Sequence, residues 1–285
     1  MNIQRACLRL LAGLLLGGLA APACMAADKP LILAVHPYLP AKEIQQRFAP
    51  LAAYLGQTLG KPVEVRIGGS YDEHIEAIGR DRVDIAFMGP ASYVRMLDQY
   101  GSKPLLGRFE VNHQPHLYGV IAVRQDSPLR ALKQLKGKRF AFGDPESTMS
   151  HIVPHAMLKD AGVPLSALAE HRFLGSHKNV ALAVLAGDFD AGAMKQEVFA
   201  EFAAKGLRAL ATTPPTPDHL FIARANLPAQ EIEHLRRALL QIKDRPDAEA
   251  ILEPLHNGLN ALIPASEKDY APLRRMMRGL ETADR

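Results

Sequence analysis

Residues 30–100 read PLILAVHPYLPAKEIQQRFAPLAAYLGQTLGKPVEVRIGGSYDEHIEAIGRDRVDIAFMGPASYVRMLDQY. In this stretch, three short apolar runs suited to strands alternate with three segments of helical periodicity. The runs are Leu31–Val35, Val63–Ile67 and Val83–Phe87, and the helical segments are Ala41–Leu59, Tyr71–Gly79 and Ala91–Tyr100. Strands that are apolar throughout are typical of sheets covered on both faces. The alternation therefore predicts an α/β fold with a mostly parallel sheet.

A second set of alternating strands and helices follows, without sequence repetition. Strands are expected near 117–123, 140–142, 172–174, 190–194 and 207–211, with helices from Ser147, His177 and Glu197. Three prolines, Pro214, Pro215 and Pro217, then interrupt the chain. Leu220–Ala223 returns as a strand, and we expect the tail to be helical from Ala229 to Leu280.

The length and the proline cluster favour two lobes over a single large doubly wound domain. We place residues 27–123 plus 220–285 in lobe 1 and residues 124–219 in lobe 2. Val120–Arg124 and Thr212–Leu220 are then the two crossings of a two-stranded hinge. In either arrangement, ligands belong at the carboxyl ends of the strands, where helices begin.

The first residues have the form of a secretory signal peptide. Arg5 and Arg9 precede the apolar run Leu10–Ala21, and small residues follow it. We expect cleavage after residue 26, periplasmic localisation and a mature chain without cysteine. A lipid anchor at Cys24 is the less favoured alternative, because no leucine opens the lipobox before it.

Composition excludes several classes of function. The formal charge of +4 falls to +2 once Arg5 and Arg9 are removed, and the basic residues are scattered, so we expect no nucleic-acid partner. The chain has no Gly-x-Ser-x-Gly elbow, Walker loop or His-Glu-x-x-His motif, so we expect no enzyme. His151 and His155 are four residues apart, but Pro154 makes a common helix face doubtful. We therefore predict no metal and no cofactor.

Residues 142–151, FGDPESTMSH, carry the strongest chemical signal. A strand ends at a tight turn, and a hydroxyl-rich segment opens a helix. The free backbone donors of a helix N-terminus suit a tetrahedral oxyanion, which makes Ser147, Thr148 and Ser150 candidate ligand-binding residues. Taken alone, the same residues are more typical of an ordinary helix cap.

The segment Asp144-Pro145-x-Ser147-Thr148 resembles the phosphate/phosphite/phosphonate-binding proteins of ABC transporters. Other blocks agree in order: Arg47–Leu55, Val83–Tyr93, His177 with Ala181–Val184, and Asp190–Ala193. The resemblance implies a type II periplasmic-binding-protein fold whose two lobes close on a small phosphorus oxyanion. It also implies delivery of that ligand to an ABC permease in the inner membrane.

The resemblance assigns roles to further residues. His177 matches a histidine that binds phosphoryl oxygens, and Tyr71 matches a ligand-binding tyrosine. Their alternatives are an exposed capping histidine and ordinary packing of the tyrosine. Ser92 lies at another strand-to-helix junction and is a further candidate. Met149 departs from the family pattern, which often has a hydroxyl residue there. This departure from the family pattern leaves the identity of the bound oxyanion open.

Glu197 and Asp218 match acids that hold an ammonium group in relatives binding aminoalkylphosphonates. The alternatives are plain helix capping for Glu197, a turn for Asp218, or neutralisation of the acids by Lys195 or Lys178. The leading hypothesis is thus a monomeric periplasmic binding component of an importer. A partner of a membrane sensor kinase or chemoreceptor is the alternative, and a secreted phosphoester or phosphonate hydrolase is less favoured.

Overall fold

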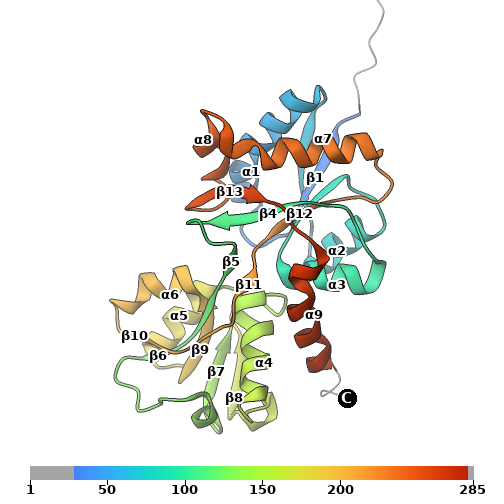
Figure 1. Cartoon of the computed structure of the whole chain (residues 1–285). Coiled ribbons are helices and arrows are strands. Elements are labelled where there is room, and N and C mark those ends of the chain that lie inside the picture. The colour runs from blue at the N-terminus through green and yellow to red at the C-terminus, as the bar shows by residue number, and fades with distance from the viewer. Residues whose placement is uncertain (1–28, 282–285) are drawn as a thin grey trace, which may run out of the picture.

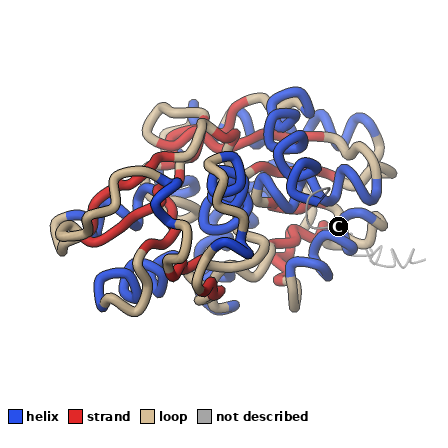
Figure 2. Tube along the Cα trace, turned by 90° about the horizontal axis from the view of Figure 1, so that it is seen from below, coloured by secondary structure: helices blue, strands red, loops and turns tan. Residues whose placement is uncertain are grey.

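The computed structural model describes residues 29–281, so the expected signal peptide (1–26) and Cys24 lie outside the described residues. The described chain forms two α/β lobes joined by two crossings (Figure 1). Seen from below, helices surround the strands of both lobes (Figure 2). The predicted two-lobed α/β architecture is confirmed.

The first lobe contains a six-stranded sheet in the order β13-β4-β12-β3-β1-β2. Strand β1 is parallel to β2 and β3, whereas β12 is antiparallel to β3 and β4, and β13 is antiparallel to β4. The strands are β1 (Leu31–Val35), β2 (Val63–Ile67), β3 (Ile85–Met88), β4 (Leu105–Val111), β12 (Leu220–Ala223) and β13 (Leu259–Ile263). The helices are α1 (Ala41–Leu59), α2 (Tyr71–Gly79), α3 (Pro90–Tyr100), α7 (Ala229–Leu240), α8 (Ala248–Leu252) and α9 (Glu267–Glu281), with a 3₁₀ turn at Ile242–Asp244.

The second lobe contains a five-stranded sheet in the order β10-β6-β9-β7-β8. Strand β7 is parallel to β8 and β9, and β6 is antiparallel to β9 and β10. The strands are β6 (Gly119–Arg124), β7 (Arg139–Phe142), β8 (Glu170–Phe173), β9 (Ala191–Lys195) and β10 (Leu207–Thr212). The helices are α4 (Val153–Asp160), α5 (His177–Ala186) and α6 (Gln196–Ala203), with a π-helical turn at Thr148–Ile152 and 3₁₀ turns at Leu132–Leu135 and Leu165–Ala167.

The connection between the lobes is a two-stranded antiparallel ribbon of β5 (His116–Leu117) and β11 (Thr216–Pro217). Beside it, Gly119 N donates to Thr213 Oγ1 at 2.8 Å, and Thr213 N donates to Gly119 O at 2.9 Å. The crossing expected at Val120–Arg124 is wrong, because these residues lie in β6 of the second sheet. The lobe boundary implied by the sheets therefore falls before Gly119 and not at residue 123. An apolar run reads the same in either sheet, so the sequence could not assign it.

Two further expectations need correction. The sheets are mixed and not mostly parallel, because the chain returning from the second lobe enters as β12, antiparallel to both its neighbours. Strands β4 and β13 were not predicted. In β4, Gly107, Arg108 and Glu110 interrupt the apolar run by which a strand is recognised. Strand β13 lies inside the tail that was expected to be helical.

Both faces of the first sheet are buried. In β1, Leu33 and Val35 belong to one apolar cluster, while Ile32 and Ala34 belong to the cluster on the opposite face. Helices α1 and α7 contribute to the first cluster, and α2 and α3 to the second. Since complete burial of a large aliphatic side chain contributes about 1.5–3 kcal/mol, these two layers hold the strand ends of the lobe in place.

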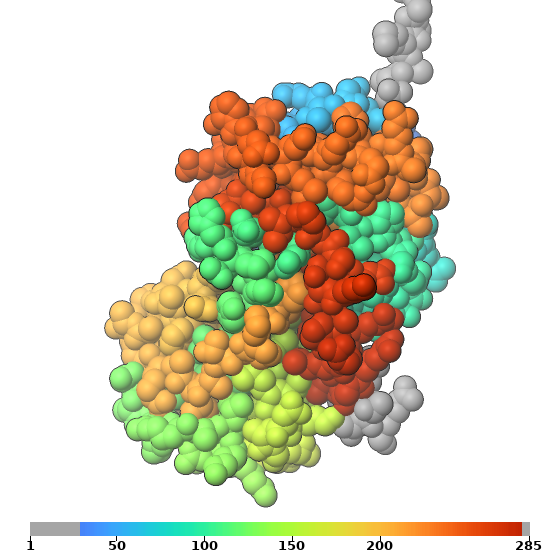
Figure 3. Space-filling model, viewed as in Figure 1, coloured from blue at the N-terminus to red at the C-terminus, as the bar shows by residue number. Residues whose placement is uncertain are grey.

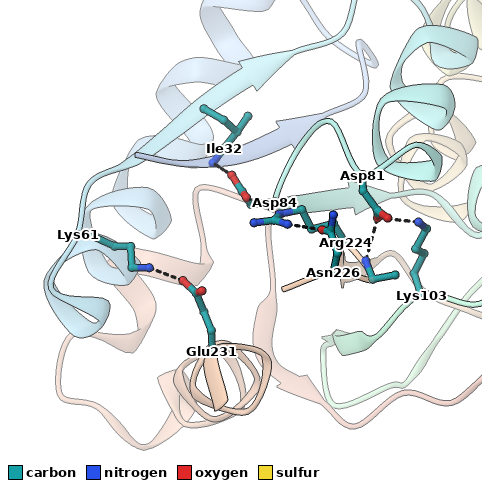
Figure 4. A network of polar contacts seen from close by, with 9 residues as sticks. Ile32, Lys61, Asp81, Asp84, Lys103, Arg224, Asn226 and Glu231 are labelled. Carbon is teal, nitrogen blue, oxygen red and sulfur yellow. Dashed lines mark hydrogen bonds and ion pairs between the residues drawn. The ribbon is translucent and has the colours of Figure 1, made fainter. Parts of the chain in front are cut away.

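A network of polar contacts joins neighbouring strands of the first sheet at the end where β1 and β3 begin (Figure 4). The Asp84 carboxylate accepts hydrogen bonds from Ile32 N and from Arg224 Nε, both at 2.7 Å. Asp81, at φ 57°, accepts from Lys103 Nζ at 2.7 Å and from Ala225 N at 2.8 Å. These bonds join the beginning of β1 and β3 to the end of β12.

Helix α9 contacts both lobes (Figures 1 and 3). Leu273 and Met277 share an apolar cluster with Met149 and Val153 of the second lobe. Lys159 Nζ also donates to Gly279 O at 2.6 Å. The C-terminal helix thus packs across the junction of the lobes.

Candidate functional site

A cavity of about 270 Å³ lies between the two lobes, near the lower end of the range for small-molecule pockets. The first lobe and the ribbon contribute His36, Tyr38, Leu39, Tyr71, Gly89, Ser92, Leu117 and His219 to its lining. The second lobe contributes Asp144, Glu146, Ser147, Thr148, Met149, Gly175, Ser176, His177, Lys178, Lys195 and Val198.

The lining residues gather where strands end and helices begin. His36 follows β1, Gly89 follows β3, and Ser147 lies between β7 and the π-helical turn. Ser176 caps α5, and Lys195 ends β9. Carboxyl ends of parallel strands meet at one edge of a sheet, so the two sheets present these junctions to one another.

The structure brings five of the expected site residues to this cavity: Tyr71, Ser92, Ser147, Thr148 and His177. The Ser147 hydroxyl oxygen accepts a hydrogen bond from Ser150 N at 3.1 Å, which leaves its proton available to the cleft. Ser92 is 1% exposed, and its hydroxyl has no hydrogen-bond partner within residues 29–281. Because buried polar groups are normally paired, this hydroxyl favours a ligand atom beside it.

Three expected residues do not line the cavity. Ser150 is fully buried and donates to Ala193 O at 2.6 Å, because the π-helical turn directs its side chain into the second lobe. Glu197 is exposed in the first turn of α6. Asp218 is buried behind His219 and does not line the cavity itself. The two acids therefore do not form a pair around a bound ammonium group.

Thr148 connects the two lobes. Its side-chain oxygen accepts a hydrogen bond from Ala91 N, in the first turn of α3, at 3.1 Å. Glu146 forms a second connection, an ion pair with Arg95 of α3, which also contacts Asp72 at 3.0 Å. Met149 stands at the position where the family pattern often has a hydroxyl residue. Its side chain is fully buried in the apolar layer beside Val153.

His177 is held as a neutral hydrogen-bond donor. Its Nδ1 accepts a hydrogen bond from Lys195 N at 3.1 Å, so the ring proton resides on Nε2. Burial and the nearby Lys195 ammonium lower the pKa of His177 to about 3. A neutral ring with an Nε2–H suits a phosphoryl oxygen as acceptor.

Sequence reasoning missed two lining histidines. The rings of His36 and His219 lie next to one another and next to Phe87: their centroids are 5.5 and 5.3 Å from that of Phe87 and 6.0 Å from each other. His36 comes directly after the first apolar run, so the expectation that ligands bind where strands end applied to it as well. His219 precedes a strand, and no sequence signal marked it.

His219 and Asp218 form a buried dyad. Asp218 Oδ1 accepts from His219 Nδ1 at 2.8 Å and from His219 N at 2.6 Å. Burial acts to raise the pKa of Asp218, but the hydrogen bonds from His219 and the charge of Lys195 outweigh it and lower that pKa. Burial and Lys195 also lower the pKa of His219, although Asp218 acts in the opposite direction.

The charged groups of the lining include both signs. Lys178 and Lys195 line the cavity and form no ion pair with any other described residue. Asp144 also lines it, and Asp144 Oδ1 accepts from Glu146 N at 2.7 Å. With Glu146 paired to Arg95, the two lysines give the cleft cations for an anionic ligand.

Neither a metal site nor a membrane span is found in the part of the chain that the structure describes. Within 29–281 no group of three or more His, Cys, Asp or Glu side chains is arranged to hold a metal ion. None of the helices in the same range is long and apolar enough to span a bilayer. His151 and His155 stack on one another with centroids 5.5 Å apart.

A family model described as "ABC transporter, phosphonate, periplasmic substrate-binding protein" matches residues 33–270. The phosphate-import protein PhnD of Mycolicibacterium smegmatis is 30% identical over 196 residues, which span 61% of this chain and 61% of the relative. The phosphonates-binding periplasmic protein of Escherichia coli K12 is 22% identical over 82% of this chain and 72% of the relative.

Solved structures show the same fold. PhnD1 of Prochlorococcus marinus in complex with methylphosphonate has a TM-score of 0.77 and 22% identity, covering 89% of this chain and 98% of that one. XAC2383 of Xanthomonas citri bound to ATP has a TM-score of 0.78 and 20% identity, covering 88% of this chain and 98% of that one.

Proposed function

The chain belongs to the family of periplasmic substrate-binding proteins of phosphonate ABC transporters, and from this premise we propose that it binds a small phosphorus oxyanion for an importer. The observation that carries the proposal is the cavity between the lobes, where Ser92, Ser147 and His177 converge as donors. Lys195 supplies the positive charge that an anionic ligand needs inside this cleft.

We further propose that the ligand's substituent is not recognised through an ammonium group. Glu197 is exposed and Asp218 is bonded to His219, whereas Lys195 lines the cavity. A lysine repels an ammonium group, so methylphosphonate, phosphite or phosphate fits the Lys195 side of the cleft better than an aminoalkylphosphonate does.

Delivery to an inner-membrane ABC permease, a cleaved signal peptide, a periplasmic location and a monomeric state complete the proposal. Periplasmic relatives that serve ABC transporters support the location and the partner. Mass spectrometry of protein exported to the periplasm should find an N-terminus near Ala27 and no diacylglyceryl group on Cys24.

Titration calorimetry tests the proposed ligand class. Protein purified from the periplasm is titrated with phosphate, phosphite, methylphosphonate and 2-aminoethylphosphonate. We expect saturable one-to-one binding of at least one of them, with 2-aminoethylphosphonate no better than methylphosphonate, and no turnover of a model phosphoester. Absence of binding across the whole panel contradicts the proposed function, and hydrolysis of the phosphoester supports a hydrolase instead.

A further inference from the structure

The cleft contains two imidazole nitrogens that are left as hydrogen-bond acceptors. Nδ1 of His36 lies 3.2 Å from Phe87 O. A carbonyl oxygen only accepts, so Nδ1 of His36 carries the proton and Nε2 keeps its lone pair. His36 lines the cavity, and its Nε2 has no hydrogen-bond partner within residues 29–281.

His219 has the same arrangement. Its Nδ1 donates to the carboxylate of Asp218 at 2.8 Å, which fixes the proton on that nitrogen. Asp218 is 6% exposed, and Tyr270 OH donates to Asp218 O at 2.9 Å, so the dyad is held firmly. Nε2 of His219 faces Gly89 at the beginning of α3, where an added Cβ would lie 3.7 Å from it.

Burial and the charges around the two rings keep them neutral. Burial lowers the pKa of His36 and of His219, and a protonated ring would also place a second cation beside Lys195. The titratable or charged groups facing His219 are Asp218, Lys195, His36, His177 and His256, and those facing His36 are His74, His219, Lys195, Tyr38 and Tyr71. Asp218 is the one anion among them.

We propose that Nε2 of His219, aided by Nε2 of His36, accepts a hydrogen bond from a protonated phosphoryl oxygen of the ligand. The cleft would then select an oxyanion that carries a P–OH group over one of the same shape and charge whose oxygens carry no proton. This inference rests on the proposed function and adds the protonation state of the ligand to it. Ser92, His177 and Lys195 remain as donors for the unprotonated oxygens.

Sulfonates provide the discriminating comparison. Singly protonated methylphosphonate and methanesulfonate have the same shape and the same charge, but only the phosphonate has a proton on oxygen. A sulfonate would direct an oxygen lone pair at the lone pair of Nε2. Sites built to bond a hydroxyl reject analogues that lack it by factors of about 10⁴ in favourable cases, and we expect a preference of at least about 100-fold here.

The experiment is calorimetric titration of the purified protein with methylphosphonate and methanesulfonate at pH 6.5. Strong preference for methylphosphonate is the expected result. Comparable affinity for the two ligands overturns the inference while leaving the proposed function standing. Failure to bind either ligand or any phosphorus oxyanion contradicts the proposed function, and the inference falls with it.

Variants at His219 distinguish the loss of the hydrogen-bond acceptor Nε2 from the loss of ring packing against Phe87. His219→Phe keeps a ring stacked on Phe87 but has no acceptor, so the preference for methylphosphonate should fall at least about tenfold. His219→Gln offers an amide oxygen and should retain part of the preference. Near-ultraviolet circular dichroism checks that each variant is folded, and His36→Phe provides the same comparison at the second ring.

Lys195→Met is the matched control within the cleft. It removes a charge and no acceptor, so both affinities should fall by a similar factor and their ratio should stay within about threefold of the wild-type ratio. An unchanged ratio in His219→Phe would contradict the acceptor role of His219, and a collapse of the ratio in Lys195→Met would assign the discrimination to Lys195 instead.

The pH dependence gives an independent readout. Methylphosphonate affinity should fall by about tenfold per pH unit once the pH exceeds the second pKa of the ligand, because the bound form carries one proton more than the free form. Methanesulfonate does not titrate in this range and should show no such slope. Rising methylphosphonate affinity above that pKa would mean that the cleft binds the dianion, contrary to the inference.

Discussion

Ser92 has a buried hydroxyl without a partner in the described chain, at the wall of the cleft. An unpaired buried hydroxyl costs free energy in the ligand-free protein and gains a bond when a ligand arrives. Ser92→Ala should therefore weaken methylphosphonate binding by about tenfold while leaving the free energy of unfolding unchanged or slightly raised. Calorimetry and denaturant unfolding of the ligand-free protein measure the two effects.

Ser147→Ala is the companion variant. Ser147 Oγ caps the helical turn by accepting from Ser150 N, so its loss should lower stability by about 1 kcal/mol as well as affinity. Equal destabilisation by the two substitutions would indicate that Ser92 has a structural partner and no role in binding.

Single residues show where sequence reasoning worked. Ser147 was predicted from the hydroxyl-rich start of a helix, and Tyr71 and His177 from the family resemblance; all three line the cavity. The resemblance also selected Glu197, in the first turn of α6, but its side chain is exposed, whereas Lys195 and Val198 close to it line the cleft. Position along the chain predicts the junction, but it does not predict which side chain at the junction points inward.

Secondary-structure elements were predicted well where apolar residues recur with a regular strand or helix period. The bounds of β1, α1, β2 and α2 agree with the apolar runs and helical segments of the sequence. The π-helical turn at Thr148–Ile152 was not predicted, because it depends on packing of Ser150 against Gly143, where an added Cβ would lie 2.3 Å from Ser150 Oγ. Such tertiary contacts have no signature in local periodicity.

Asp84 couples three strands through its carboxylate. Asp84→Ala would leave the Ile32 amide and the Arg224 guanidinium without their acceptor, at a cost of about 2–3 kcal/mol in the free energy of unfolding. Denaturant unfolding measures this cost. The network lies at the end of the sheet opposite to the cleft, so ligand affinity should change by less than about twofold. A large loss of affinity with unchanged stability would contradict this assignment.

At the scale of the molecule, the lobes meet through contacts that the sequence could not predict. Thr148 accepts from Ala91 across the cleft, and Arg95 pairs with Glu146 beside it. Each contact joins α3 of the first lobe to the segment after β7 of the second. Helix α9 adds an apolar contact to both. These partners are more than 50 positions apart along the chain, so only the folded arrangement reveals them.

The distribution of buried histidines makes the stability of the whole protein depend on pH. His36 and His74 are each 2% exposed, and both donate to Phe87 O, through Nδ1 and Nε2 respectively. Nδ1 of His74 has no partner in the described chain. Burial lowers the pKa of His74 to about 4, so this ring stays neutral in the folded protein at pH values where the unfolded chain is protonated.

The unfolded chain therefore binds more protons below its histidine pKa of about 6.5, and stability must fall as the pH falls from there toward the folded pKa. At pH 5 a ring such as His74 lowers the free energy of unfolding by about 2 kcal/mol relative to pH 8. Denaturant unfolding at pH 8, 6 and 5 measures the slope. His74→Gln keeps an amide donor for Phe87 O but cannot titrate, so the free energy of unfolding of this variant should depend less steeply on pH. His234 is exposed, so the control variant His234→Gln should keep the wild-type slope. Constant stability of the wild-type protein across this range would show that His74 is protonated in the fold, with a partner for Nδ1.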